Sequence, residues 1–114
     1  MGLSEQTRHL IGAERLALMK PTVMLINAAR GGIVDEQALY EALKAKRLAG
    51  AALDAFEQEP LEKSPLFALD NVIVSSHIAG YTENALTTLS LSCVEDVIAV
   101  LRGDQPRHPV ALPR

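Results

Sequence analysis

The sequence predicts an α/β protein with a small parallel sheet of about three strands, flanking helices and a long C-terminal helix. Short apolar runs at 23–27, 51–56 and 72–76 have the length of buried strands, and helical patterns separate them. Strands that alternate with helices favour parallel crossovers in an open sheet. The length of 114 residues and the hydrophobic content of 48% fit one packed domain over 1–114.

Two helices are expected before the second strand. The first covers 12–19 and ends where Pro21 cannot continue it. Asp35 is a good N-cap for the next helix, and its apolar positions lie on one face. These positions are Leu39, Ala42 and Leu43. Gly50 is expected to stop this helix.

The C-terminal part is expected to form a loop, a strand and a long helix. The proline-containing segment 57–70 is a loop with one turn of helix at 65–69. Thr82 can cap the last helix, whose apolar positions step by three or four as far as Leu101. The tail at 105–114 is expected to be irregular.

Charge and cysteine content exclude several classes of protein. Eleven Lys and Arg against 14 Asp and Glu give a net charge of −3, which argues against a nucleic-acid partner. One cysteine, Cys93, excludes a disulfide scaffold, and its place on an apolar helix face predicts an inert core thiol. The apolar runs are shorter than the ~18 residues of a membrane span. We therefore expect a cytoplasmic protein without a membrane partner or a metal site.

Polar residues follow each predicted strand, where ligands of open α/β sheets gather. Arg30 follows the first strand, Asp54 and Glu59 lie at and after the end of the second, and His77 ends the third. A guanidinium binds a carboxylate through two hydrogen bonds, and an imidazole beside a carboxylate can donate a proton to a carbonyl oxygen. These residue types suit a reaction at a carbonyl next to a carboxylate. A redox reaction there needs a cofactor.

Three of these residues also have a purely structural interpretation. Arg30 before two glycines is typical of a solvated loop, His77 of a hydrogen-bonded histidine at a strand end, and Glu59 before proline of a turn. The glycines form neither Gly-x-Gly-x-x-Gly nor a phosphate-binding P-loop. Strand-end position alone leaves both interpretations open.

Four segments in order resemble the C-terminal half of the NAD-binding domain of D-isomer-specific 2-hydroxyacid dehydrogenases. They are 3–8 with 10–12, 19–21 with 26–35 (INAARGGIVD), 49–61 (AGAALDAFEQEPL), and 71–80 (NVIVSSHIAG). The resemblance covers almost the whole chain. It implies part of a Rossmann-type domain and hydride transfer, with NAD or NADP, between a 2-hydroxy acid and its 2-oxo acid.

The resemblance also implies residue roles. Arg30 corresponds to the arginine that binds the substrate's carboxylate and carbonyl, His77 to the acid/base, and Glu59 to its partner carboxylate. Asp54 corresponds to the aspartate near the nicotinamide carboxamide. The implied cofactor contacts are Ala28, Ala29, Arg30, Asp54, His77 and Gly80, and no metal is implied.

The sequence departs from the family pattern in three respects. Ser75 and Ser76 replace the usual Thr-Pro before the histidine, and Ala55 replaces a commoner valine. The Gly-x-Gly-x-x-Gly half, the acidic ribose-binding residue and the substrate domain are not in this sequence. We therefore expect a fragment that is inactive alone and self-associates through an unpaired strand edge.

Alternatives to an enzyme fragment are a non-catalytic module, a half that pairs with a separately encoded N-terminal half, and an unrelated α/β domain. The identity of the 2-hydroxy acid, the choice between NAD and NADP, and the oligomeric state stay open.

Overall fold

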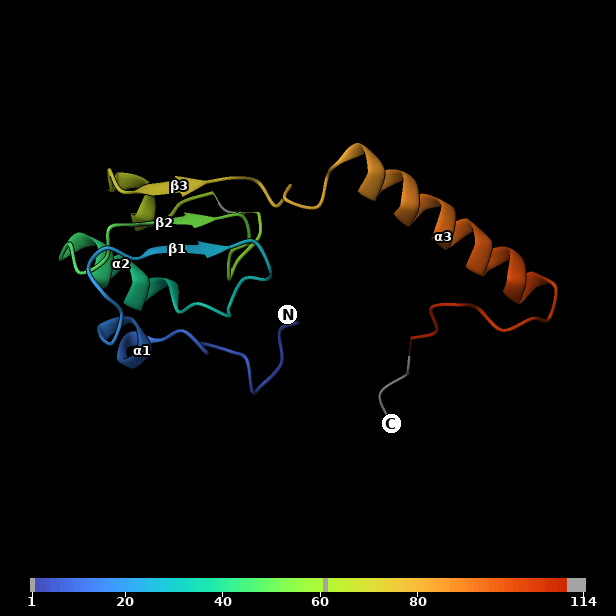
Figure 1. Cartoon of the computed structure of the whole chain (residues 1–114), viewed down its shortest axis with the longest axis horizontal. Helices are drawn as coiled ribbons and strands as arrows, with labels where there is room; N and C mark the ends of the chain where they lie inside the picture. The colour runs from blue at the N-terminus through green and yellow to red at the C-terminus, as the bar shows by residue number, and fades with distance from the viewer. Residues whose placement is uncertain (1, 61, 111–114) are drawn as a thin grey trace. The chain divides into compact units, whose positions relative to one another are not determined.

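The computed structural model describes residues 2–60 and 62–110 and divides the chain into two compact units, Met1–Ile78 and Ala79–Arg114. The first unit contains the sheet, and the second contains the long helix α3 (Figure 1). The assignment of 1–114 to one part of a larger domain stays a prediction.

The sheet has three parallel strands in the order β1-β2-β3, as the sequence predicts. The strands are β1 (Met24–Asn27), β2 (Gly50–Leu53) and β3 (Val72–Val74), and each is shorter than its apolar run. In register, Asn27 pairs with Leu53, which in turn pairs with Val74. Parallel strands in this register bring their carboxyl ends to one edge of the sheet. The candidate site residues come directly after these ends in the chain.

Helix α2 (Glu36–Lys44) begins as predicted, because the Asp35 side chain accepts a hydrogen bond from the Ala38 amide at 2.9 Å. Its predicted apolar face is buried. The prediction that Gly50 stops this helix is wrong. The chain leaves the helix at Lys46, whose φ is 55°, and Gly50 is the first residue of β2. A Cβ at Gly50 would lie 2.9 Å from the Asn71 carbonyl oxygen, so glycine allows β2 and the start of β3 to approach.

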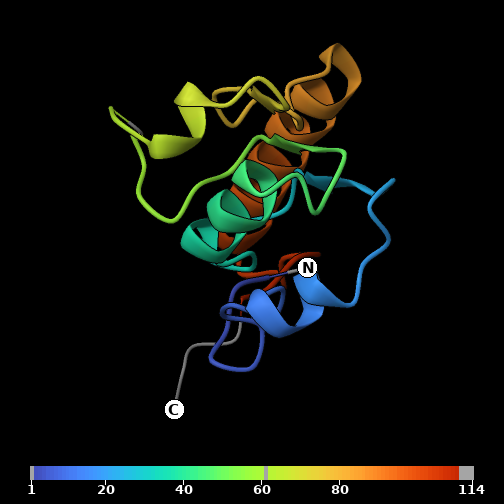
Figure 2. The ribbon, with the colours of Figure 1, turned by 90° about the vertical axis from the view of Figure 1, so that its left-hand side faces the viewer.

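Two short helices complete the first unit. Helix α1 (Ala13–Ala17) lies within the predicted 12–19 and packs against α2 (Figure 2). The predicted turn of helix at 65–69 is the 3₁₀ helix η1 (Pro65–Ala68), which the Ser64 side chain caps. The hydrophobic core joins these elements to one face of the sheet through Leu16, Leu25, Val34, Leu39, Ala42, Leu43, Leu48, Ala51, Leu53, Phe56 and Leu66.

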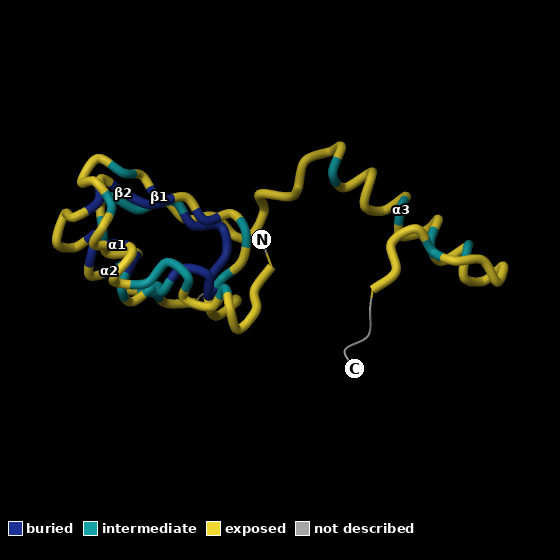
Figure 3. Tube along the Cα trace, turned by 60° about the horizontal axis from the view of Figure 1, so that its bottom comes forward, coloured by how far each residue is buried: buried dark blue, intermediate teal, exposed yellow. Residues whose placement is uncertain are grey.

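Burial alternates along β1, and Figure 3 shows the buried and exposed parts of the chain. In β1, Leu25 is buried, whereas Met24 and Ile26 are 60% and 74% exposed. Ile73 of β3 is also exposed. The predicted strands are therefore buried on one face only in the described part of the chain, because its helices cover that face of the sheet.

The second unit consists of α3 (Glu83–Leu101) and the segment after it. Thr82 caps the helix as predicted, by accepting from the Ala85 amide at 3.1 Å. Asp96 of α3 accepts a hydrogen bond from the Arg107 amide and binds the His108 ring, and residues 105–110 are irregular as expected. The rest of the predicted irregular tail, 111–114, lies outside the described residues.

Two properties of α3, its exposure and its apolar length, correct predictions made from the sequence. Cys93 is exposed and not a core thiol, because no residue of α3 is buried within the described chain. The helix is also long and apolar enough to span a membrane, with a mean hydropathy of 1.4, so the statement that the apolar segments are too short is wrong. Core helices of water-soluble proteins have the same length and hydropathy, so this finding alone does not place α3 in a membrane.

Candidate active site

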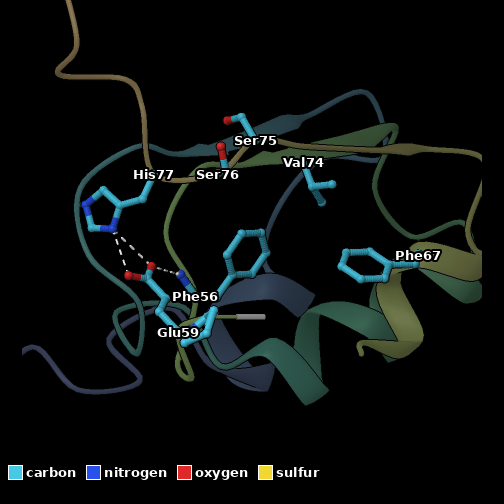
Figure 4. Close-up of a pocket in the computed structure, with 8 residues that line it drawn as sticks. Phe56, Glu59, Phe67, Val74, Ser75, Ser76 and His77 are labelled. Carbon is cyan, nitrogen blue, oxygen red and sulfur yellow. Dashed lines mark hydrogen bonds and ion pairs between the residues drawn. The ribbon is translucent and has the colours of Figure 1, made fainter. Parts of the chain in front are cut away.

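Glu59 and His77 form a hydrogen-bonded pair beyond the ends of β2 and β3 (Figure 4). The Nδ1 atom of His77 lies 2.9 Å and 3.1 Å from the two carboxylate oxygens of Glu59. One of these oxygens also accepts from the Phe56 amide at 2.9 Å. The hydrogen bond from His77, followed by that from Phe56, lowers the pKa of Glu59.

The state of Glu59 determines which ring nitrogen of His77 can react. A carboxylate with a lowered pKa is ionised at neutral pH and only accepts hydrogen bonds, so Nδ1 of His77 carries the proton. Nε2 then points away from Glu59 (Figure 4). The side chains are 43% and 38% exposed for His77 and Glu59, so Nε2 can reach a ligand from solvent.

A cavity of about 810 Å³ lies beside this pair. Its walls are mainly apolar, and the carboxylate and imidazole stand at one end (Figure 4). The lining residues are Phe56, Glu59, Pro60, Phe67, Val74, Ser75, Ser76 and His77. An apolar cavity with a few polar groups is typical of a site for a small molecule.

Asp54 lies under the segment that carries His77. It is 6% exposed, and its Oδ1 accepts from the Ser75 hydroxyl at 2.6 Å and from the Ile78 amide at 2.9 Å. The structure therefore joins Asp54, Glu59 and His77 in one region, as strand-end position predicts.

Arg30 occupies a short loop that the Asn27 side chain shapes. Asn27 is buried, accepts from the Ala29 amide and donates to the Arg30 carbonyl at 2.9 Å. The exposed Arg30 guanidinium donates to the Ala29 carbonyl at 2.7 Å. Among residues 2–60 and 62–110, no hydrogen bond or ion pair joins Arg30 to Glu59 or His77. Of the four candidate residues, the structure therefore brings Asp54, Glu59 and His77 into one region, and no described hydrogen bond or ion pair adds Arg30 to Glu59 or His77.

The remaining predicted cofactor contacts differ in position. Ala28 is exposed and Ala29 half-buried in the loop that also carries Arg30. Gly80 belongs to the second unit, and a Cβ built on it would meet nothing within 4 Å. No group of three or more side chains that could hold a metal ion occurs among residues 2–60 and 62–110.

Sequence reasoning missed the contacts that support the loop before Glu59. The Glu36 amide donates to the Glu57 carboxylate at 3.2 Å, and the Glu57 amide donates to the Glu36 carboxylate at 2.6 Å. The ring of His9 binds the same Glu57 carboxylate at 3.1 Å. Burial, more than the nearby charges of Glu57 and Glu59, raises the pKa of Glu36. His9, Glu36 and Glu57 lie far apart in the sequence, and their spacing matches no motif that a single sequence could reveal.

Gly31 was also missed as a site residue. A Cβ there would lie 1.7 Å from the Phe56 carbonyl oxygen, so the Arg30 loop and the loop leading to Glu59 touch through their backbones. The available signal is the pair of consecutive glycines, which by itself predicts only a solvated loop.

Comparison with known proteins assigns this chain to a family. Residues 1–79 match the family model described as D-isomer specific 2-hydroxyacid dehydrogenase, NAD binding domain. The chain is 46% identical, over 97% of its length, to a D-3-phosphoglycerate dehydrogenase of Methanocaldococcus jannaschii. It is 50% identical, over 91% of its length, to a glyoxylate reductase of Thermofilum pendens. It spans 21% and 31% of the lengths of these two relatives.

A solved structure agrees with the sequence comparisons. The D-isomer specific 2-hydroxyacid dehydrogenase of Xanthobacter autotrophicus Py2, in complex with NADPH and MES, matches 97% of this chain at a TM-score of 0.80 and 40% identity. The match covers 46% of that protein. The Rossmann-type parallel fold and the resemblance stated from the motifs are therefore confirmed. The chain belongs to the D-isomer-specific 2-hydroxyacid dehydrogenase family, and most of it corresponds to part of the NAD-binding domain.

Proposed function

We propose that this chain carries the acid–base and carboxylate-binding residues of an NAD(P)-dependent oxidoreductase that interconverts a small 2-hydroxy acid and its 2-oxo acid. The hydrogen-bonded Glu59–His77 pair beside an apolar cavity is the observation that carries this proposal. The chain is a minor part of each relative's length, so we assign the activity to the chain combined with an N-terminal half. Family membership and the single cysteine support a cytoplasmic location.

His77 is the proposed general acid and base. Its Nε2 donates a proton to the carbonyl oxygen of the 2-oxo acid during reduction and takes it back during oxidation. Glu59 holds Nδ1–H and stabilises the charged imidazolium, so the ring stays in one tautomer and one orientation. General acid catalysis of this kind accelerates a reaction by about 10² to 10⁴.

Arg30 is the proposed binding residue for the substrate carboxylate. Its guanidinium is exposed and bonded only locally, to the Ala29 carbonyl, among the described contacts. Exchange of that neutral acceptor for a carboxylate would give two parallel hydrogen bonds between opposite charges. We therefore expect Arg30 to contribute mainly to substrate affinity.

The described residues fit the nicotinamide end of NAD or NADP. Asp54 offers a buried carboxylate, an acceptor that suits a carboxamide, and the loop at Ala28 and Ala29 offers backbone groups. We propose these residues, with Arg30, His77 and Gly80, as the cofactor contacts. When bound, the cofactor supplies or accepts the hydride, for which no protein side chain is suited.

A chimera tests the proposal. This chain replaces the aligned segment of the glyoxylate reductase of Thermofilum pendens, and NAD(P)H oxidation is followed with glyoxylate and hydroxypyruvate. We expect turnover from the chimera, and a decrease in kcat of about 10² or more for His77→Gln. Arg30→Gln is expected to raise KM for the oxo acid more than it lowers kcat.

His108→Gln provides the matched control. His108 also binds a carboxylate through Nδ1, that of Asp96 at 3.0 Å, but it lies outside the proposed site. We expect near-normal turnover from this variant. An active chimera in which His77→Gln behaves like His108→Gln would contradict the role of His77. The isolated chain is expected to bind NADH weakly, and micromolar affinity in a nicotinamide fluorescence titration would contradict that expectation.

A further inference from the structure

The backbone at His77 has an unfavourable conformation, so other contacts must stabilise it. Its φ is 58°, in the left-handed region that costs a non-glycine residue about 1–2 kcal/mol. Its neighbour Ser76 has no ring to restrict its φ, and both residues are exposed. Packing against a core therefore does not maintain the turn that aims the His77 ring at Glu59.

The side chain of Asp54 forms hydrogen bonds to this turn on both sides of His77. Its Oδ1 accepts from the hydroxyl of Ser75, two residues before His77, and from the amide of Ile78, one residue after it. The distances of 2.6 Å and 2.9 Å are those of hydrogen bonds to a charged acceptor. Asp54 itself directly follows β2 and is buried, so it provides a fixed point from the sheet.

We propose that Asp54 is a positioning residue, whose carboxylate clamps the turn between Ser75 and Ile78 so that Nδ1 of His77 meets the Glu59 carboxylate. The clamp is separate from the proposed contact of Asp54 with the cofactor, and its importance for turnover rests on the proposed role of His77. Ser75 thus helps to position His77 through its hydrogen bond to Asp54, although no described hydrogen bond joins Ser75 to His77 or Glu59.

The electrostatic effect of Asp54 opposes its positioning effect. The negative charge of Asp54 raises the pKa of Glu59, whereas the hydrogen bond from His77 lowers it, and the hydrogen bond is the larger cause. Asp54→Asn would change both effects at once. Ser75→Ala removes one arm of the clamp and keeps the charge, so it isolates positioning.

The test is an NMR titration of the Glu59 side-chain carboxyl carbon in the full 114-residue chain. In the unmodified chain we expect the pKa of Glu59 below the ordinary value of glutamate, since His77 and the Phe56 amide bind it. Ser75→Ala is expected to move the Glu59 titration up toward the ordinary value, because His77 leaves the carboxylate for part of the time. Ser75→Thr keeps the hydroxyl and is expected to restore the original titration.

Ser76→Ala is the matched control, since Ser76 lines the same cavity but makes no described hydrogen bond to Asp54. It should leave the Glu59 titration unchanged. An unchanged titration in Ser75→Ala, or an equal shift in Ser76→Ala, would overturn the proposal. The methyl signals of Leu39 and Leu43 report whether each variant keeps its core.

A measurement on the unmodified chain covers the case in which Ser75→Ala does not fold. The Ile78 amide, bound to Asp54, should exchange with solvent at least about tenfold more slowly than the Ser76 amide. Equal exchange of the two amides would overturn the clamp. Neither readout needs turnover, so a failed chimera and a failed clamp are distinguishable.

Discussion

Replacing Gly31 by alanine should disturb the contact between the two loops of the site. A Cβ at Gly31 would lie 1.7 Å from the Phe56 carbonyl oxygen and 2.0 Å from its carbonyl carbon. The oxygen would have to retreat by about 1.7 Å to reach the ordinary contact distance of 3.4 Å. Because the opposing atoms are backbone and Phe56 is buried, no side-chain rotation can relieve the overlap.

The expected loss in the free energy of unfolding is at the upper end of the range for overpacked positions. Extra methyl groups in well-packed regions cost about 1–3 kcal/mol and occasionally more, and a backbone clash of this size should reach about 3 kcal/mol. The amide of the same residue, Phe56, donates to Glu59, so a shift of the Phe56 carbonyl should weaken the Glu59–His77 pair as well as the fold. Stability and site geometry are thus expected to fail together.

Urea unfolding of the chain, followed by circular dichroism, measures the loss. Two glycines serve as controls. Gly32→Ala should cost about 1–2 kcal/mol, because φ is +77° there while its Cβ would meet Leu3 at an ordinary 3.4 Å. Gly12→Ala should cost within about 1 kcal/mol, since φ at this N-cap is −98°. If Gly31→Ala unfolds at the same urea concentration as Gly12→Ala, the inferred close approach of the loops is wrong.

Three further changes test other parts of the first unit. Leu39→Ala, at a fully buried position of α2, should cost about 2–5 kcal/mol in urea unfolding with little change in the slope; a loss below 1 kcal/mol would contradict its core position. Asp35→Ala should cost about 1 kcal/mol through the lost cap of α2, which amide exchange at Ala38 would detect. Burial raises the pKa of Glu36, so its ionisation disfavours the folded state as pH rises beyond the ordinary carboxyl range. Glu36→Gln should therefore unfold at higher urea than the unmodified chain at neutral pH, and the two should converge in acid; a difference that grows in acid would refute the cause assigned.

The elements that the sequence predicts correctly have strong local signals. Asp35 before an amphipathic segment and Thr82 before the last helix identify two caps, and both side chains make the expected hydrogen bonds. Apolar runs flanked by helices identify the strands and their parallel pairing. The end of α2 was misplaced because Lys46, and not a glycine, takes the left-handed conformation there.

Burial is less accessible from the sequence, because it depends on what covers each surface. Ile26 and Leu25 are equally apolar, yet only Leu25 is buried, since the helices of the first unit lie on its side of the sheet. No residue of α3 is buried among the described residues, so Cys93 on this helix is exposed as well.

The site was predictable in kind but not in arrangement. Strand-end position identified Asp54 and His77, and the family resemblance identified the pairing with Glu59. The left-handed turn at His77 and the bond from Ser75 to Asp54 require three-dimensional proximity between residues 21 positions apart. A hydroxyl before a histidine has no distinctive spacing, so no rule on a single sequence could have found it.

The order of the sheet has a consequence for how the first unit folds. Each strand pairs with the strand that follows it in the chain, so β1 and β2 come together across α2, and β3 then adds to β2. Each pairing still closes a loop of more than twenty residues, since Met24 pairs with Gly50 and Ala51 with Val72, and the entropic cost of closure grows with loop length. Non-local parallel pairing of this kind is slow compared with the formation of a helix. The refolding rate of the unit should therefore depend on substitutions in β1, α2 and β2, which form the first of the two pairings.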